Sequence, residues 1–343
     1  MLEVYTLEQA ERWDAIVCTF RDYDVYWLSG YAKAFQVHGD GEPLLFYCED
    51  GSARGIHVMM KRDIAKDIHF AGKIEEGRWF DLAAPYGYGG WLIEGTHSED
   101  LFRSYRGWLE KNGIISEFVR FHPVLKNHEA CRGFYEIECL GQNVCMDLSS
   151  PEVIRNNLTR ENRNRIRKAV KNGIEVHHGN HLDVYETFRI LYNETMVRVH
   201  AAPYYYFDPA FYKALREDLP QNSQVFWAEK DGRVIAAYIM IYANGRMSYF
   251  LSGSLEEFNS LAPGNLIMYT AALWGCENGY RTLLLGGGVG SRDDSLLRFK
   301  RTFRKGEPDH FYIGEKTVDP EKYRYLLSLR NSPARSFFPQ YRA

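Results

Sequence analysis

The amino-acid sequence predicts an α/β protein with mixed (α+β) sheets, built from two similar domains in tandem. Each half of the chain contains a β-hairpin pattern, at 44–60 and at 224–241, in which two apolar runs flank an acidic Gly turn. Each half later contains a helix with a Trp five residues before a terminating Gly and then an apolar strand, at 107–121 and 273–286. This shared order favours a duplicated domain over a chance match of two common patterns.

The length of 343 residues predicts two hydrophobic cores, because a single core rarely extends over so long a chain. We place the first domain at 1–148, the second at 149–315, and a C-terminal segment at 316–343, which we expect to pack back on the first domain. Ser149 lies three residues before Glu152, with Pro151 between them, and this spacing predicts a capping box that begins the helix after the join.

The cysteines and the apolar runs bear on the compartment. The six cysteines include no CxxC pair and are expected to be free thiols. The N-terminus lacks the basic and apolar regions of a signal peptide, and no apolar run approaches the ~18 residues of a membrane span. We therefore expect a cytoplasmic protein with no membrane span.

A basic segment at 160–173 carries six basic side chains and one acid, Glu161. The chain's net charge is -3, so the segment's +5 leaves -8 for the remainder, which argues against a duplex-DNA-binding protein. Thr159 and Gly173 bracket a predicted helix, followed by a strand at 174–178.

Helical spacing sorts the side chains of this segment into two faces. The basic stripe consists of Arg160, Arg163, Arg167 and Lys171, and the apolar face of Ile166, Ala169 and Val170. A solvated helix face and a local site for a phosphate or a nucleic-acid end both explain the stripe. In the second interpretation, Arg163 and Arg167 contact the phosphates of a donor substrate.

Several motifs follow one another in a fixed order. They are FDLAAPYGYGG, NRNRIRKAVKNGIEV, TMVRVHAAPYYYF, FLSGSLEEFNSLAPGNLIMY, and LLLGGG followed by DDSLLRFKRTFRKGEPDHFYIGE. From about 24 to 323 the chain resembles the Fem-type aminoacyltransferases of peptidoglycan bridge formation and their relatives, which have tandem GNAT-like (acyl-CoA N-acyltransferase fold) domains. Fem-type members transfer an amino acid from aminoacyl-tRNA to an amine of a cell-wall precursor, and other relatives use acyl-CoA.

The resemblance implies roles for residues of the second half. Lys300 matches the lysine of the family's FK..F motif and would stabilise an oxyanion; alternatively it is a surface lysine between the core-facing Phe299 and Phe303. Arg198 and Tyr205 lie in the stretch that resembles the acceptor-side wall, where Arg198 would hold a phosphate or carboxylate. The glycine-rich run 286–290 is expected to be a loop leading into the helix of Lys300.

Other candidates for the site come from three strands or loops. Tyr249 is expected on a strand beside the substrate. Tyr86 and Tyr88 alternate with glycines that permit close approach to a ligand, although turn geometry explains the glycines equally well. Asp81 is a candidate general base, and substrate-assisted proton transfer is the alternative.

Acyl transfer to an amine requires no Ser or Cys nucleophile, because the carbonyl of an ester or thioester is already activated. The sequence has no GxSxG or HExxH motif, and we predict neither a metal nor a cofactor. A coenzyme A site would need a Q/RxxGxG/A turn, but the corresponding stretch has Asn259 at the basic position and a single Gly264 after Pro263.

We therefore expect a transferase that moves an aminoacyl group from the acceptor end of aminoacyl-tRNA to an amine of a peptide, sugar or cell-wall precursor. The alternatives are an acyl-CoA-dependent N-acyltransferase, in which a coenzyme A thioester is the donor, and a non-catalytic nucleic-acid- or polysaccharide-binding protein on the same fold.

Overall fold

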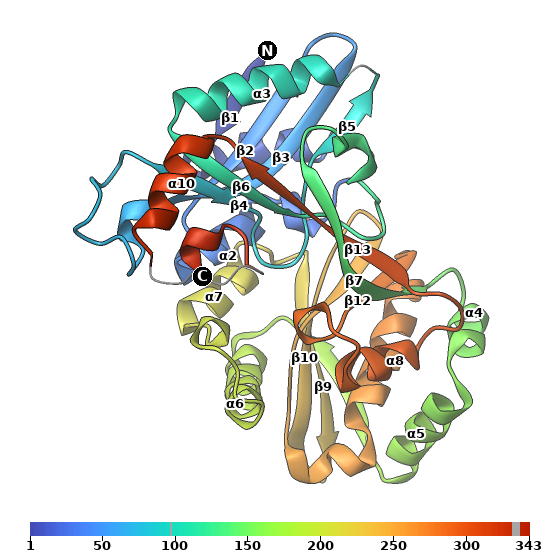
Figure 1. Ribbon diagram of the computed structural model, residues 1–343. Coiled ribbons are helices and arrows are strands. Elements are labelled where there is room, and N and C mark those ends of the chain that lie inside the picture. The colour runs from blue at the N-terminus through green and yellow to red at the C-terminus, as the bar shows by residue number, and fades with distance from the viewer. Residues whose placement is uncertain (97, 331–336) are drawn as a thin grey trace. The chain divides into compact units, whose positions relative to one another are not determined.

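The computed structural model describes residues 1–96, 98–330 and 337–343. The chain divides into two compact units, the first formed by 1–140 with 311–343 and the second by 141–310 (Figure 1). Within the described residues, no helix has the length and apolar character needed to cross a membrane.

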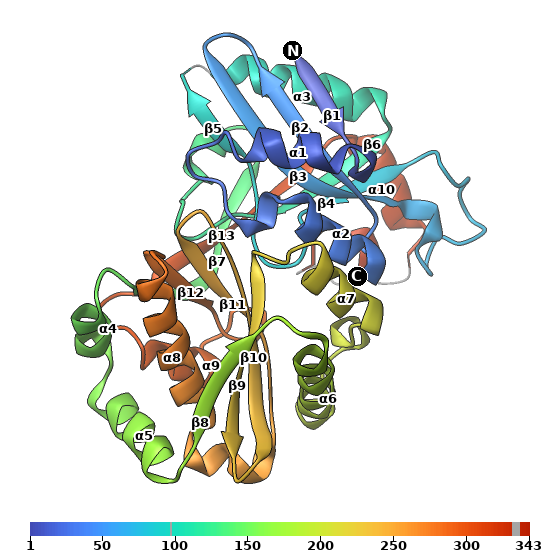
Figure 2. The same ribbon diagram turned by 180° about the vertical axis from the view of Figure 1, so that it is seen from behind.

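The first unit has a mixed sheet with the strand order β1-β2-β3-β4-β6-β13, and β5 pairs with β3. The strands are β1 (Leu2–Tyr5), β2 (Glu42–Glu49), β3 (Ala53–Asp63), β4 (Phe80–Ala83), β5 (Leu92–Gly95), β6 (Ile114–Arg120) and β13 (Asp309–Thr317). The α-helices are α1 (Ala10–Val17), α2 (Ser29–His38), α3 (Glu99–Lys111) and α10 (Pro320–Ser328). Helix α3 covers one face of the sheet and α1 and α2 the other (Figures 1 and 2). Strands β4 and β6 are parallel.

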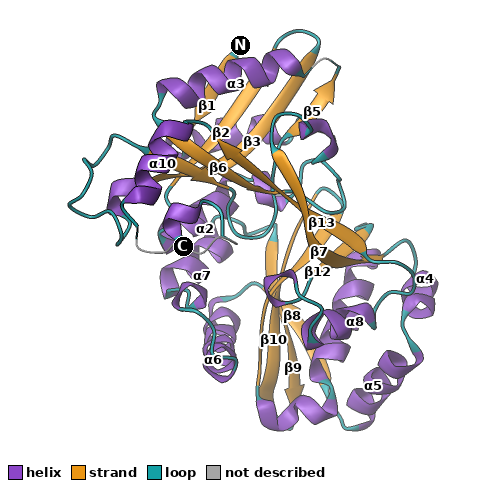
Figure 3. Cartoon of the chain, viewed as in Figure 1, coloured by secondary structure: helices purple, strands orange, loops and turns teal. Residues whose placement is uncertain are grey.

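The second unit repeats this plan with the strand order β7-β12-β11-β10-β9-β8. The strands are β7 (Glu136–Asp147), β8 (Glu175–Gly179), β9 (Ser223–Lys230), β10 (Arg233–Ala243), β11 (Arg246–Ser254) and β12 (Thr282–Gly286). The helices are α4 (Pro151–Asn157), α5 (Arg160–Lys171), α6 (Leu182–Arg198), α7 (Pro209–Glu217), α8 (Pro263–Glu277) and α9 (Ser295–Arg301). Helices α4, α5 and α8 lie on one face and α6 and α7 on the other (Figure 3). Strands β11 and β12 are parallel.

Both predicted hairpins are present, as β2–β3 and β9–β10. Helices α3 and α8 each end just before a glycine with positive φ, 68° at Gly113 and 80° at Gly279, as the left-handed position after a helix requires. The aromatic rings of Phe46 and Trp108 lie 4.7 Å apart in the first unit. Their counterparts Phe226 and Trp274 lie 5.7 Å apart in the second. The predicted duplication is confirmed.

Two local predictions are corrected. The cap of α4 is Ser150, not Ser149: the Ser150 hydroxyl accepts a hydrogen bond from Val153 N at 3.2 Å, because Pro151 occupies the first helical position. On α5, Ile166 and Ala169 are buried as expected, but Val170 is 59% exposed. Thr159 caps α5 as predicted, accepting from Asn162 N at 3.2 Å.

Candidate functional site

Lys300 lies on α9, which follows the glycine-rich loop as expected. Asp294 fixes both elements, because one carboxylate oxygen accepts from Leu297 N in the first turn of α9 and the other from Val289 N in the loop, each at 2.9 Å. An Asp three residues before a helical amide is a standard cap signal, so the sequence contained this information.

The Lys300 side chain is only 6% exposed, so the interpretation as a surface lysine is wrong. Its Nζ donates to the carbonyl oxygen of Gly287 at 2.6 Å and lies 5.3 Å from the ring centroid of Tyr249. It forms no ion pair with a carboxylate of the described residues. The structure thus brings together two of the residues singled out in the sequence, Lys300 and Tyr249.

Burial lowers the pKa of Lys300 to about 7, against the opposing attraction of Asp294. A lysine with such a pKa is present in both protonation states at neutral pH. Among the described residues no carboxylate lies within hydrogen-bond distance of its ammonium form, which would be stabilised by an anion that forms beside it.

Tyr249 connects Lys300 to Tyr238, a residue that the sequence did not single out. The two tyrosine rings lie 5.2 Å apart, and a Cβ atom added to Gly264 would lie 2.1 Å from the Tyr238 hydroxyl oxygen. Glycine is therefore required at 264 for packing against Tyr238. In the sequence, Tyr238 is one apolar residue within a hairpin strand, and no pattern distinguishes it from a core residue.

Arg198 and Tyr205 lie at the end of α6 and just beyond it. The Arg198 guanidinium donates to the carbonyl oxygen of Ser254, the last residue of β11, at 2.9 Å, and forms no ion pair within the part of the chain that the structure describes. Tyr205 is half-buried in a short turn, with its ring 5.4 Å from that of Tyr204.

The basic stripe of α5 lies on the opposite face of the second unit's sheet from α6 (Figures 1 and 2). Arg163 is half-buried and donates to the carbonyl oxygen of Leu158 at 2.6 Å, whereas Arg167 is exposed and contacts the Asn164 side chain at 3.0 Å. The structure therefore does not bring Arg163 and Arg167 together with Arg198.

The N-terminus of α8 is the place where a coenzyme A pyrophosphate would be expected, and it is poorly equipped for one. Ala262 has a φ of 62°, and Pro263 removes an amide N–H from the first turn. The preceding turn contains Glu256 and Glu257, and Lys168 of α5 already donates to the Ser260 carbonyl oxygen at 2.7 Å. These features disfavour a bound pyrophosphate.

The 84–90 loop of the first unit holds Tyr86 and Tyr88 close to other aromatic side chains. The Tyr88 ring lies 5.5 Å from Tyr26 and 5.6 Å from Phe311. The Tyr31 hydroxyl donates to the carbonyl oxygen of Tyr86. Both predicted tyrosines are half-buried, so each retains exposed surface.

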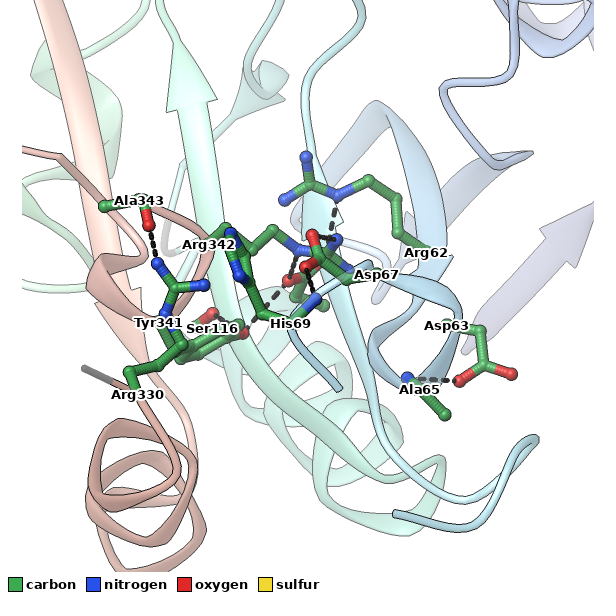
Figure 4. A network of polar contacts seen from close by, with 11 residues as sticks. Arg62, Asp63, Ala65, Asp67, His69, Ser116, Arg330, Tyr341, Arg342 and Ala343 are labelled. Atoms are coloured by element: carbon green, nitrogen blue, oxygen red, sulfur yellow. Dashed lines mark hydrogen bonds and ion pairs between the residues drawn. The ribbon is translucent and has the colours of Figure 1, made fainter. Parts of the chain in front are cut away.

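Asp81 is completely buried on β4 and belongs to an ionic network with Tyr341 and Arg342. Figure 4 shows its partners Arg62, Tyr341 and Arg342. Arg62 Nε donates to it at 2.7 Å, Tyr341 Oη at 3.0 Å, and Arg342 also pairs with it. Although burial alone raises it, the charges of Arg62 and Arg342 hold the pKa of Asp81 below its usual value. A buried, doubly paired carboxylate is a weak proton acceptor, so we do not retain Asp81 as the general base.

Comparisons with known proteins agree with this architecture. Residues 156–301 match the family model described as an acetyltransferase (GNAT) domain. The chain is 30% identical over 171 residues to UDP-N-acetylmuramoylpentapeptide-lysine N(6)-alanyltransferase of Weissella viridescens. That alignment spans about half of both proteins, 48% of this chain and 49% of the relative.

Solved structures extend the likeness to the whole fold. The crystal structure of FemX superposes with a TM-score of 0.66 at 14% identity, covering 96% of this chain and all of FemX. A conserved protein of Bacteroides thetaiotaomicron gives a TM-score of 0.58 at 11% identity, covering 92% of this chain and 99% of that protein.

Residues 156–301 thus match a GNAT domain, and the whole chain, with its repeated unit, is similar in fold to FemX. In architecture the chain is FemX-like, and about half of it resembles the Weissella alanyltransferase in sequence.

Proposed function

We propose that this protein transfers an aminoacyl group from aminoacyl-tRNA to a primary amine on a cell-wall precursor. The observation that carries the proposal is Lys300, a buried cation with no carboxylate partner among the described residues. A buried positive charge of this kind is costly unless an anion answers it, and the tetrahedral intermediate of acyl transfer is such an anion.

In the proposed reaction, the amine nitrogen attacks the ester carbonyl carbon of the donor and forms a C–N bond. Lys300 donates a hydrogen bond to the developing oxyanion. The intermediate then collapses, the bond between the carbonyl carbon and the ribose oxygen breaks, and that oxygen receives the proton lost by the amine. Tyr249 lies against the ammonium and supports its orientation.

The same proposal assigns the remaining candidates to substrates. Arg198 offers its guanidinium to a phosphate or carboxylate of the acceptor, and Tyr205, Tyr86 and Tyr88 provide aromatic surface. Arg163 and Arg167 contact phosphates of the tRNA. The proton transfer is substrate-assisted.

Two lines of support favour aminoacyl-tRNA over acyl-CoA as the donor. The N-terminus of α8 combines Pro263 with two nearby acidic residues, which is unfavourable for a pyrophosphate. The name of the Weissella relative gives an alanyl transfer to the lysine of UDP-N-acetylmuramoyl pentapeptide. We propose that this chain accepts an acceptor of the same class.

The test offers the purified protein two donors in parallel, aminoacyl-tRNA and acetyl-CoA, each with UDP-N-acetylmuramoyl pentapeptide as acceptor. Mass spectrometry of the acceptor is expected to detect an added aminoacyl group with the first donor alone. Acetylated acceptor, or micromolar binding of coenzyme A in a calorimetric titration, would contradict the assignment of the donor.

A further inference from the structure

Arg120, the last residue of β6, is a half-buried cation that neither the sequence patterns nor the relatives assign. Its Nε donates to the carbonyl oxygen of Gly87 at 2.9 Å, and its guanidinium carbon lies 5.0 Å from the ring centroid of Phe311. These contacts hold one edge and one face of the guanidinium. The terminal nitrogens donate to no other group within residues 1–96, 98–330 and 337–343.

Three other partly buried arginines of the first unit are neutralised by a carboxylate. Arg54 pairs with Glu94 at 2.6 Å, Arg62 with Asp81 at 2.7 Å, and Arg342 with Asp67 at 3.0 Å. Arg120 forms no ion pair with any carboxylate that the structure describes. Because a desolvated guanidinium is stabilised by an anion, the open edge of Arg120 favours an anionic ligand.

The loop that holds Arg120 is itself tightly fixed. Gly87 has a φ of 98°, and a Cβ atom there would lie 2.7 Å from the Tyr26 ring and 2.8 Å from the Tyr31 hydroxyl. The Tyr88 ring packs at 5.6 Å against Phe311, the same ring that lies under Arg120. The carbonyl that orients the guanidinium therefore has little freedom, which is the preorganisation that a binding residue needs.

The position of Arg120 in the sheet points to a ligand as well. Arg120 and the 84–90 loop follow the carboxyl ends of the parallel strands β4 and β6, the edge at which open sheets commonly bind ligands. In the second unit, Arg198 is held in a similar manner by the Ser254 carbonyl at the carboxyl end of β11. Each unit thus presents an arginine that is bound to a backbone carbonyl and has no acidic partner in the part of the chain that the structure describes.

We propose that Arg120 and the loop of Tyr86 and Tyr88 form an anion subsite that binds a phosphate or carboxylate group of the acceptor. The inference rests on the proposed function only for the identity of the ligand. Two groups of a nucleotide-linked peptide have this chemistry, the diphosphate and the C-terminal carboxylate of the peptide.

Calorimetric titrations test the subsite directly. The probes are UDP-N-acetylmuramoyl pentapeptide, UDP alone, the free pentapeptide and its C-terminal amide. The variants are Arg120→Ala, Arg120→Lys and Arg120→Gln. Arg106→Ala is the matched control, because Arg106 is an exposed arginine of the same unit that also lies over an aromatic ring, 5.7 Å from the centroid of Phe134.

We expect Arg120→Ala and Arg120→Gln to weaken binding of the nucleotide-linked peptide by about ten- to a hundredfold, the usual loss for a hydrogen-bonded charge. Arg120→Lys should lose less because it keeps the charge, and Arg106→Ala should bind like the wild type. An equal loss with UDP alone identifies the diphosphate as the ligand. A loss with the free pentapeptide but not with its amide identifies the carboxylate.

Wild-type affinity in Arg120→Gln, or an equal loss in Arg106→Ala, would overturn the subsite. Melting temperatures of all variants separate a binding defect from unfolding, and Arg120→Gln keeps a donor for Gly87 should the alanine variant fold poorly. Because these titrations require no turnover, failure of the proposed transfer reaction would appear separately, as absent product with intact anion binding.

Discussion

The two units place different chemistry at matching positions of one fold. His57 on β3 pairs with Phe46 across the first hairpin, and Tyr238 on β10 pairs with Phe226 across the second. Both are the sixth residue after the turn glycine. In each unit the paired Phe packs against the Trp of the neighbouring helix.

In the first unit this position belongs to a buried polar network around Glu117. One carboxylate oxygen of the buried Glu117 accepts from His57 Nε2 at 2.8 Å and from the hydroxyls of Tyr135 at 2.6 Å and Tyr105 at 3.1 Å. The His57 ring also stacks on Trp91 at 4.9 Å. Three donors thus converge on one oxygen of Glu117, whereas its second oxygen and His57 Nδ1 are buried without a hydrogen-bond partner among the described residues.

In the second unit the buried charge belongs to Lys300, which has no acidic partner among the described residues. Tyr238 packs against Tyr249, which in turn lies beside the Lys300 ammonium, and the only hydrogen-bond acceptor of that ammonium in the described chain is the Gly287 carbonyl. The shared fold therefore does not decide where a buried charge is left without an acidic partner. In the second unit Lys300 is a buried cation with no acidic partner among the described residues, and we propose that this charge marks the place of the reaction.

The largest effect on stability is expected from disrupting the buried hydrogen-bond network around Glu117. Glu117→Ala removes the acceptor of three buried donors and should lower the free energy of unfolding by about 3–5 kcal/mol, the usual cost of breaking a buried ion pair. Urea unfolding measures this change. The exposed Glu110, also in the first unit, provides the control, and Glu110→Ala should change little. Near-equal stabilities of the two variants would show that the network is not structural.

Replacing Lys300, the buried cation of the second unit, should lower turnover without lowering stability. Lys300→Met should lower turnover by ~100-fold, the loss typical of one oxyanion donor. Between pH 7 and the pKa of a lysine in the unfolded chain, the unfolded state binds a proton that folded Lys300 does not, so wild-type stability should rise with pH in this window. Lys300→Met should therefore be more stable than wild type at pH 6, by a margin that narrows at higher pH. A variant less stable at pH 6 would assign Lys300 a structural role.

The pH dependence of the rate distinguishes two roles for Lys300. The ratio of wild-type to Lys300→Met kcat/KM cancels the titration of the acceptor amine. If the ammonium is the active form, this ratio is constant below about pH 7 and then falls about tenfold per pH unit, because burial lowers the pKa of Lys300 to about 7. A ratio that rises up to pH 7 and then levels would instead make the neutral amine a general base.

The smallest effect is expected at the surface of α5. Arg163→Ala combined with Arg167→Ala should weaken tRNA binding several-fold at low salt, and the difference from wild type should shrink as salt is raised. Filter binding at a series of salt concentrations measures this. The double variant of Lys213 and Arg281 to Ala removes the same charge from other exposed positions of the second unit and serves as the control. A loss that is independent of salt would contradict a phosphate contact.

The sequence predicted the repeated elements because their signals are local. The turn glycines, the Trp-to-Gly spacing and the Thr159 cap each act over a few residues. The site depended on longer-range contacts. Nothing near Lys300 in the sequence indicates burial beside Tyr249, and nothing near Asp81 indicates pairing with Arg342, which lies 261 residues away.

Arg120 illustrates the same limit. It is the one basic residue of the strand IISEFVR, in which four of the seven residues are apolar. Whether that cation meets a carboxylate or remains open is decided by Gly87 and Phe311, which are distant in the sequence. The pattern identifies an unusual residue, and only the fold gives its partners.

The most direct test of the central claim is a single-turnover reaction with labelled aminoacyl-tRNA and UDP-N-acetylmuramoyl pentapeptide, run in parallel for the wild type and Lys300→Met. We expect the label to move to the amine of the pentapeptide with the wild type and to move ~100-fold more slowly with the variant. Equal rates for the two proteins, or no transfer by the folded wild type, would contradict it.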